Sequence, residues 1–250
     1  MHDEDKRFFG QGLPYLKTGG LRGSLIVIEG TDSVGRSTQI EQLTPWLEVQ
    51  GYAVTNTGWT RSPLLADTIN EAKAGHELTV TTFSLLYAAD FADRLENEII
   101  PALRAGFVVM ADRYMYTAFA RNAVMGADRQ WTRELFGCAL VPDLVLYLKI
   151  DVEHLIPRVL EGKGMDYWES GMHLALGSDM FDSFRRYQSR LIREYNRLAQ
   201  EFHFLTVDAR RPIETIQADL RRHIAAYLNR SKRLHAVEVG ESVTGQEDPA

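Results

Sequence analysis

The chain has 250 residues, of which 45% are hydrophobic and 25% charged, and its formal net charge is −6. This length suffices for one sizeable domain with a buried core, or at most for two small domains. The negative net charge argues against a broad nucleic-acid or anionic-membrane surface, because both need clustered positive charge. A local basic pocket for a small phosphate ligand is still compatible with this charge.

The single cysteine, Cys138, excludes an intramolecular disulfide, which suits a reducing cytosol. It lies in an apolar stretch, so we interpret it as a packing residue rather than a nucleophile. No apolar run approaches the ~20 residues that a membrane span needs, and the charged start lacks the apolar stretch of a secretory signal. We therefore expect a cytoplasmic protein with no membrane or nucleic-acid partner.

Residues 1–23 contain five glycines and one proline, without helical or strand periodicity. We expect an arm or loosely packed extension ahead of the domain. Residues 25–28 then form a short run of branched apolar side chains, which predicts the first strand.

A glycine-containing loop follows this strand directly and leads into a helical pattern from Ser37 onward. A loop of the form Gly-x4-Gly-x-Ser between a strand and a helix is typical of a phosphate-binding P-loop. Gly30 and Gly35 let backbone N–H groups point at phosphate oxygens, and Ser37 offers a hydroxyl to Mg²⁺. The predicted phosphate-binding residues are Gly30, Thr31, Asp32, Ser33, Val34, Gly35, Arg36, Ser37 and Thr38.

Arg36 stands where the usual P-loop pattern has lysine. A guanidinium is always charged and grips phosphate with two N–H groups, but it is wider than an ammonium. Phosphate binding should therefore survive, whereas catalytic efficiency is an open question. Further along, Pro45 should kink or shorten the helix that follows the loop.

Four later apolar runs predict strands at residues 52–55, 107–110, 144–150 and 204–207, of which the first is the weakest. Such runs suit parallel strands that are buried on both faces. Helical patterns fill most of the gaps, most clearly at residues 180–200. Strands that alternate with helices predict an α/β fold, a three-layer αβα domain with a parallel five-stranded sheet flanked by helices.

A glycine-rich segment at residues 161–178 fits neither period and is interpreted as a short lid insert, although an inert loop fits as well. Residues 231–250 end in a polar, glycine-containing stretch, which predicts a flexible C-terminal tail. The domain itself would then span residues 24–230.

Several short motifs occur in a fixed order along the chain. They are Ile28-Glu29-Gly30-Thr31-Asp32 with Gly35-x-Ser37-Thr38-Gln39, Thr60-Arg61-Ser62-Pro63, Leu86-Tyr87-Ala88-Ala89-Asp90, Asp112-Arg113-Tyr114, Asp166-x-Trp168-Glu169 and Val207-Asp208-Ala209. From about residue 25 to 227, their order and spacing resemble the thymidylate kinase family, whose members phosphorylate thymidine monophosphate (dTMP) with ATP.

The resemblance implies roles for the residues in these motifs. Arg61 and Arg113 would clamp the acceptor monophosphate, a task that suits forked guanidinium groups. Asp32 would accept a hydrogen bond from the sugar 3′-hydroxyl, Tyr87 would stack on the base, and Trp168 would close over the sugar.

On the donor side, the resemblance places Asp112 with Ser37 toward Mg²⁺ and Arg210 in the ATP site. The alternatives are that Asp112-Arg113 is an ion pair at a strand end, which the P-loop disfavours, and that Tyr87 is a core residue.

The sequence departs from the family pattern at three places. Besides Arg36, the family's catalytic arginine is missing, because Ser33 takes its place in the loop and Lys163 is the only basic residue of the predicted lid. Phe91 takes the acceptor-site position where the family has an arginine that reads the thymine edge. We expect Arg36 and Lys163 to share the neutralisation of transferred charge, with Asp32 and Arg113 completing the catalytic set.

The leading hypothesis is therefore an ATP- and Mg²⁺-dependent nucleoside monophosphate kinase that converts dTMP to dTDP, with a homodimer implied by the resemblance alone. The alternative is a nucleotide-binding homologue with reduced or no activity, or with a different acceptor. A switch-type GTPase is disfavoured, since no guanine-reading Asn-Lys-x-Asp segment occurs.

Overall fold

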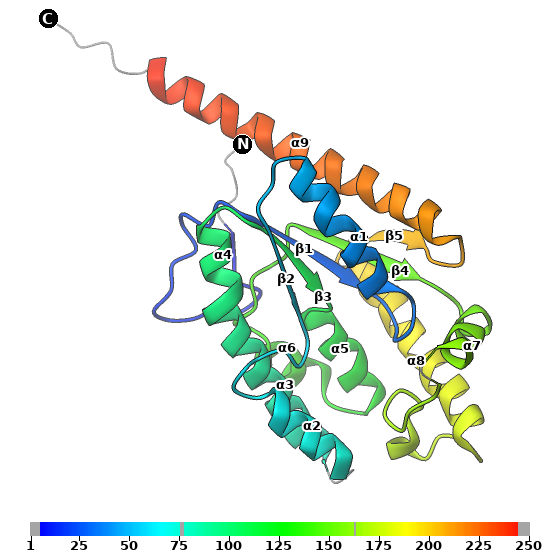
Figure 1. The fold of residues 1–250 in the computed structure, drawn as a ribbon. Coiled ribbons are helices and arrows are strands. Elements are labelled where there is room, and N and C mark those ends of the chain that lie inside the picture. Colours follow the sequence, from blue (N-terminus) through cyan, green and yellow to red (C-terminus); the bar gives the residue numbers. More distant parts are fainter. Residues whose placement is uncertain (1–5, 76–77, 163, 245–250) are drawn as a thin grey trace, which may run out of the picture.

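Five parallel strands form the centre of the structure, a computed structural model (Figure 1). It describes residues 6–75, 78–162 and 164–244, with side chains as far as Ser231. The sheet has the order β2-β3-β1-β4-β5. The strands are β1 (Ser24–Glu29), β2 (Val54–Gly58), β3 (Val108–Asp112), β4 (Leu144–Lys149) and β5 (Leu205–Asp208).

Helices connect these strands. In chain order they are α1 (Arg36–Val49), α2 (Ala66–Gly75), α3 (Val80–Arg94), α4 (Ile100–Arg104), α5 (Met115–Val124), α6 (Arg129–Leu135), α7 (Val152–Glu161), α8 (Met180–Glu201) and α9 (Ile213–Thr244). A π-helical segment, η1 (Leu95–Ile99), joins α3 to α4, and a short 3-10 helix, η2 (Met172–Leu174), precedes α8.

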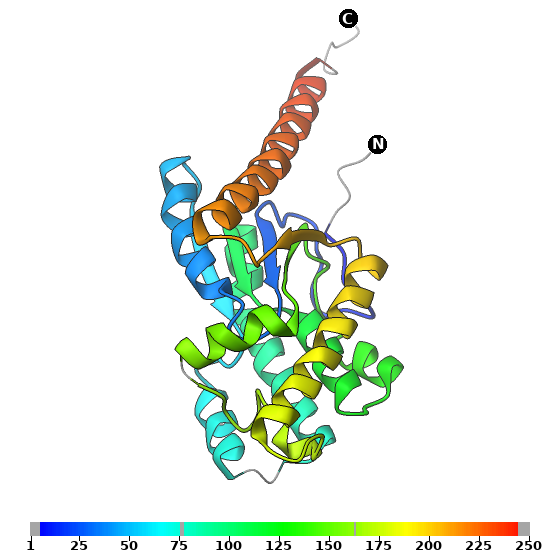
Figure 2. The same ribbon diagram turned by 90° about the vertical axis from the view of Figure 1, so that its right-hand side faces the viewer.

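The central strand β1 is buried on both faces, because its apolar side chains alternate between two cores. Leu25 and Val27 pack with residues of α3, α5 and α8, whereas Ile26 and Ile28 pack with residues of α1, α7 and α9. Figures 1 and 2 show the corresponding helices on either side of the sheet. The predicted three-layer αβα fold with a parallel five-stranded sheet is confirmed.

All five predicted strands are present, with ends shifted by a few residues. The weakest prediction, at residues 52–55, moved the most, since β2 runs from Val54 to Gly58. The helix predicted at residues 180–200 is α8, and its regularly spaced apolar side chains are buried. The expected shortening at Pro45 is wrong, because α1 continues through it to Val49. At that position the helix forfeits one backbone hydrogen bond but keeps its packed face.

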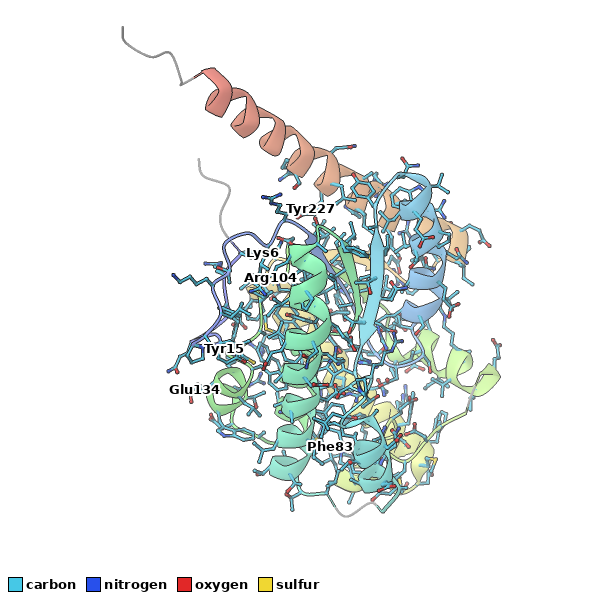
Figure 3. All side chains as sticks on the ribbon, turned by 60° about the vertical axis from the view of Figure 1, so that its left-hand side comes forward. Lys6, Tyr15, Phe83, Arg104, Glu134 and Tyr227 are labelled. Atoms are coloured by element: carbon cyan, nitrogen blue, oxygen red, sulfur yellow. The ribbon has the colours of Figure 1, made fainter. Side chains whose placement is uncertain are left out.

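The N-terminal segment contains no long regular element, yet residues 6–23 are packed on the domain rather than loosely attached. Phe8 forms an isolated antiparallel bridge with Leu140, and the N–H of Phe9 donates to the carbonyl of Ala139 at 2.7 Å. Lys6 donates to Asp143 at 2.5 Å. Figure 3 shows Lys6 and Tyr15 on this segment, which passes outside α4.

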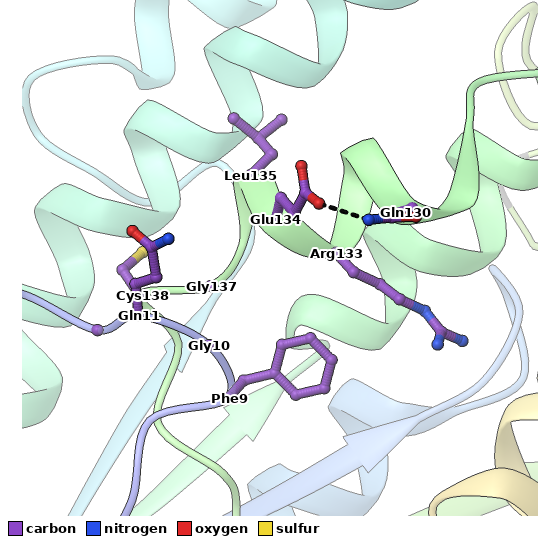
Figure 4. A pocket seen from close by; sticks show the side chains of 10 residues that line it. Phe9, Gly10, Gln11, Gln130, Arg133, Glu134, Leu135, Gly137 and Cys138 are labelled. Carbon is purple, nitrogen blue, oxygen red and sulfur yellow. Dashed lines mark hydrogen bonds between the residues drawn. The ribbon is translucent and has the colours of Figure 1, made fainter.

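A cavity of about 450 Å³ lies between this arm and α6 (Figure 4). Cys138 is one of its lining residues and is half-buried against the core. Burial raises the pKa of the Cys138 thiol, so the thiol is protonated at neutral pH. This state fits the interpretation of Cys138 as a packing residue rather than a nucleophile.

Two further boundaries concern the lid and the tail. Between α7 and α8 the backbone contains one short helix, η2, in the place of the predicted lid. The boundary predicted at residue 230 is not a break in the backbone, since α9 continues to Thr244 and extends away from the sheet (Figures 1 and 2). Residues 245–250 lie outside the described part of the chain, and the flexible tail stays a prediction. Across the described residues, every helix is too short or too polar to span a bilayer.

Candidate active site

The carboxyl ends of three neighbouring strands bring the sequence motifs together. In the sheet register, Ile28 of β1 and Gly58 of β2 both pair with Asp112 of β3. The P-loop, the segment after β2 and the Asp-Arg-Tyr segment therefore leave the sheet at the same edge. Ligand sites in open parallel sheets form at this edge.

The P-loop runs from Gly30 to Ser37 and owes its shape to three residues with positive φ. Gly30 has φ 153°, Ser33 has φ 58° and Gly35 has φ 101°. A Cβ at Gly30 would lie 2.9 Å from the carbonyl oxygen of Leu148, so this position requires glycine. No side chain caps the start of α1 at Gly35. The first N–H groups of the helix are thus available to an anion.

Arg36 turns back into the loop and is buried. Its Nη1 donates to the carbonyl oxygens of Gly30, at 2.7 Å, and of Thr31. Its Nε donates to Asp112 Oδ1 at 2.7 Å, and the other oxygen of Asp112 accepts from Ser37 at 2.8 Å. Burial favours a lower pKa for Arg36, but Asp112 and Asp32 outweigh it and raise the pKa. Arg36 is therefore a permanent cation that ties the loop to the end of β3.

A cavity of about 180 Å³ opens beside the P-loop. It is lined by six predicted site residues, namely Asp32, Arg61, Tyr87, Asp112, Arg113 and Trp168, so the structure brings these together. The lining also contains charged and aromatic side chains that were not predicted as site residues, among them Lys73, Phe83, Arg121 and Glu169. The cavity thus combines an aromatic wall with several charges of both signs.

Arg113 is held in a left-handed backbone conformation, with φ 74°. A buried carboxylate, Glu29 of β1, fixes the residues after it: its Oε1 accepts from the N–H of Tyr114 at 2.9 Å and of Thr117 at 3.2 Å. The Thr117 hydroxyl donates to the other oxygen at 2.8 Å. Burial raises the pKa of Glu29 despite these donors. The strained conformation at Arg113 is thereby stabilised by neighbouring groups.

The segment that carries Arg61 is held in a similar way, by Asp90 of α3. Asp90 is fully buried and accepts from the N–H of Thr60 at 3.2 Å and of Ser62 at 3.0 Å. Its charge is balanced by Arg94, also buried, whose Nε donates to Asp90 Oδ2 at 3.0 Å. This buried pair fixes the backbone on both sides of Arg61.

Gly58, at the end of β2, leaves room for the Arg61 side chain. A Cβ at Gly58 would lie 3.1 Å from Arg61 Nε and 3.2 Å from the carbonyl oxygen of Asp112. Glycine here therefore lets the guanidinium lie close to the strand ends.

Asp32 lies between two arginines. Its Oδ1 accepts from Arg113 Nη2, and its Oδ2 accepts from Arg121 Nη2 at 2.8 Å. Burial alone would raise the pKa of Asp32, but Arg113 and then Arg121 outweigh burial and hold the pKa well below its ordinary value. Asp32 is therefore ionised at neutral pH.

Aromatic rings form one wall of the cavity. Phe83 stacks on Tyr87 with a ring separation of 4.4 Å and on Trp168 with a separation of 5.5 Å. Trp168 comes from the predicted lid, and its Nε1 donates to the backbone oxygen of Lys73 on α2 at 3.0 Å. Tyr87 is buried in an apolar cluster and also lines the cavity, so it is a core residue, and its stacking on a base stays a prediction.

Two of the unpredicted groups have shifted pKa values. Burial, followed by repulsion from Asp32 and Asp166, raises the pKa of Glu169 to about 7. Burial, followed by the charge of Arg121, lowers the pKa of Lys73. Perturbed groups that meet in a cleft mark functional sites more often than inert surface.

Phe91 and Arg210 do not line this cavity. Phe91 is fully buried and packs edge-on against Tyr114 and Phe136, so it does not line the cavity and its assignment to the acceptor site is corrected. An aromatic ring at this position of α3 gains more from the core than from a charged cleft. Arg210 is half-exposed and pairs with Asp208 at 2.8 Å. Lys163 lies outside the described residues.

Arg158 of α7 also reaches the P-loop, and the sequence motifs did not identify it. Its Nη1 donates to the carbonyl oxygen of Val34 at 3.1 Å, and its Nη2 donates to that of Ala209 at 2.6 Å. Arg158 thus joins the P-loop to the loop after β5. Its position in the helix before the lid was the only available signal for Arg158. Arg121 lies on α5, the helix that follows the Asp-Arg-Tyr motif, and this place was the signal available for it.

The site consists of a P-loop beside a cavity lined by Arg61, Arg113 and Arg121. These features define a nucleotide-binding protein of the P-loop phosphotransferase class. The family model described as thymidylate kinase matches residues 28–220. The chain belongs to the thymidylate kinase family.

Individual relatives agree with this assignment. A protein named probable thymidylate kinase 2, from Saccharolobus solfataricus, is 37% identical over 213 residues, covering 84% of this chain and 100% of the relative. A probable thymidylate kinase from Thermococcus gammatolerans is 33% identical over 212 residues, covering 79% and 94%. A thymidylate kinase from Brachyspira hyodysenteriae is 30% identical over 166 residues, covering 66% and 82%.

Proposed function

We propose that the protein transfers the γ-phosphoryl group of ATP to dTMP, giving ADP and dTDP. One observation supports this most strongly: Arg113 belongs to both halves of the site. It lines the cavity, and its Nη1 donates to the P-loop carbonyl of Gly30 at 3.4 Å while its Nη2 contacts Asp32. A phosphate in the cavity and a phosphate in the loop would therefore share one cation.

Phosphoryl transfer needs two anionic groups held in line with their charges neutralised, and it needs little covalent chemistry. The N–H groups of the P-loop and the start of α1 would hold the ATP phosphates. Arg61 and Arg113 would hold the acceptor phosphate, in backbone positions fixed by Asp90 and Glu29. Arrangement before reaction is the main contribution of such a site.

Mg²⁺ fits the donor set at the start of α1. The Ser37 hydroxyl and the Asp112 carboxylate are hard oxygen ligands, the kind that Mg²⁺ binds together with water and phosphate. When bound with ATP, the ion would neutralise charge on the phosphates. Asp112 would then exchange part of its contact with Arg36 for the ion or its water.

Purified protein with ATP and Mg²⁺ should be assayed with dTMP, dUMP, dCMP, dAMP, dGMP and UMP, with ADP release and product identity both measured. We expect dTMP to be the best acceptor, and Arg113→Met to reduce kcat/KM by at least a hundredfold because its guanidinium serves both halves. Absence of turnover with every acceptor, or a clearly better acceptor than dTMP, would overturn the proposal.

Two further features are the cellular compartment, inferred from the sequence composition, and the oligomeric state, inferred from the family resemblance. We infer that the protein works in the cytoplasm and as a homodimer. Sedimentation equilibrium checks the second point, and a monomer at micromolar concentration would contradict it.

A further inference from the structure

Arg121 is a cavity residue that the known motifs do not include. It lies on α5, four residues after Thr117 and thus on the same face of the helix. Its side chain is 20% exposed and lines the cavity together with Arg61, Arg113 and Lys73. Among the described residues, the one hydrogen bond of this side chain is the 2.8 Å contact from Nη2 to Asp32 Oδ2. A guanidinium has five N–H donors, so most of them remain available.

The charges around the cavity show what this contact does. Asp32 accepts from Arg113 at one oxygen and from Arg121 at the other. If Arg113 were its only partner, the carboxylate would cancel the charge of the arginine that faces the acceptor phosphate. Because Arg121 shares Asp32, the three groups together retain one positive charge.

The lining as a whole shows the same balance. Its cations are Arg61, Lys73, Arg113 and Arg121, and its acids are Asp32, Asp112 and Glu169. Counted with every acid ionised, the lining has one excess positive charge, and removing Arg121 cancels it. A monophosphate carries a charge of roughly −1.5 to −2 at neutral pH, and a partly desolvated cavity screens its repulsion from Asp32 much less than water does.

We propose that Arg121 is an acceptor-site residue that neutralises Asp32 and thereby leaves Arg113 charged for the acceptor monophosphate. This inference rests on the proposed function in one respect, namely that the cavity binds a nucleoside monophosphate. It assigns to α5 a cation in a cavity to which α3 contributes the aromatic side chains Phe83 and Tyr87.

The test is a double-mutant cycle in dTMP binding, measured by calorimetry on the full-length protein. Arg121→Met should weaken dTMP binding at least tenfold, while thymidine, which lacks the phosphate, binds within about twofold of its wild-type affinity. Asp32→Asn removes the charge that Arg121 neutralises, so the same Met substitution in that background should cost less than threefold. Arg121→Lys should retain part of the affinity, because the charge remains.

Arg129→Met is the matched control, since Arg129 also pairs with an acid, Glu194 at 2.6 Å, but lies on α6 away from the cavity lining. It should leave dTMP binding unchanged. In steady-state assays, Arg121→Met should raise the KM for the acceptor and leave the KM for ATP unchanged, a split that a merely structural defect would not produce.

Equal dTMP affinity in Arg121→Met and wild type would overturn the role of Arg121 and leave the proposed function standing. An equal loss in both Asp32 backgrounds, or an equal loss for thymidine, would overturn the charge mechanism. If another monophosphate binds instead of dTMP, the choice of dTMP fails and the cycle is run with that ligand. If the wild type binds no monophosphate, both proposals fail.

Discussion

The buried pair of Asp90 and Arg94 connects the stability of the domain to the position of an acceptor arginine. Both side chains are at most 1% exposed, and Asp90 also accepts from the N–H groups on either side of Arg61. Asp90→Asn keeps the shape but leaves Arg94 as an uncompensated buried cation. Breaking a buried pair in this way costs about 3–5 kcal/mol, so we expect the free energy of unfolding to fall by that amount.

A second substitution separates stability from function. Asp90→Asn with Arg94→Met removes both charges and should recover most of the lost stability. It should not restore the KM for the acceptor, because the N–H groups of Thr60 and Ser62 bond to different oxygens of Asp90. Asn has a single acceptor oxygen, so one of the two N–H groups loses its partner, at a cost of about 1–3 kcal/mol. Urea denaturation and acceptor KM are measured on wild type, single and double variants. A single variant within about 0.5 kcal/mol of wild type would refute the reasoning.

Three shorter predictions follow from other contacts. Gly58→Ala should raise the acceptor KM about tenfold because its Cβ meets Arg61 Nε at 3.1 Å, whereas Gly75→Ala should not, since a Cβ there meets no atom of the described residues within 4 Å. Arg158→Met should raise the KM for ATP about tenfold and leave the acceptor KM unchanged, because it removes the contact with the P-loop carbonyl of Val34. A raised acceptor KM with an unchanged KM for ATP would contradict this role of Arg158. The pKa of Glu169 is about 7, above its ordinary value of 4.5, so the folded state retains a proton that the unfolded state has released. The free energy of unfolding of the wild type, measured in urea, should therefore fall relative to Glu169→Gln as pH rises from 4.5 to 7, and equal pH profiles would contradict this.

The parts of the fold that could be predicted are those that local sequence determines. The run at residues 25–28 and the two glycines of the loop are sufficient for a strand and a P-loop, because hydrophobic period and positive φ are local properties. The place of Asp112 and Arg113 at the ligand-binding edge was predictable from the apolar run before them, since strand ends share one edge of a parallel sheet. Their roles were implied by the family resemblance alone.

The residues that were missed come from helices and from the lid. Lys73, Phe83 and Arg121 reach the cavity from α2, α3 and α5, whose mutual positions depend on tertiary packing that no short window contains. Phe91 shows the reverse error: a motif position implied contact with the acceptor, but a large ring is more stable in the core. Near the C-terminus, polar composition did not indicate that α9 continues to Thr244, because a polar sequence does not exclude a helix.

The role of Arg36 can be resolved by comparing two substitutions. Arg36→Lys keeps a positive charge, but one ammonium cannot serve Asp112 Oδ1 and the carbonyls of Gly30 and Thr31 in the way that the planar fork does. Losing one charged hydrogen bond should cost about 1.5–3 kcal/mol of stability, with kcat within about tenfold of wild type because the charge remains near the phosphates. Arg36→Met removes the charge, leaves Asp112 without its hydrogen-bonded cation, and should lower kcat by roughly a hundredfold or more. Initial rates of ADP release measure kcat, and urea denaturation measures the free energy of unfolding. Equal kcat in Arg36→Met and wild type would mean that Arg36 shapes the empty loop and takes no part in transfer. The predicted order, wild type above lysine above methionine, instead requires the guanidinium to act on the transferred charge as well as on the loop.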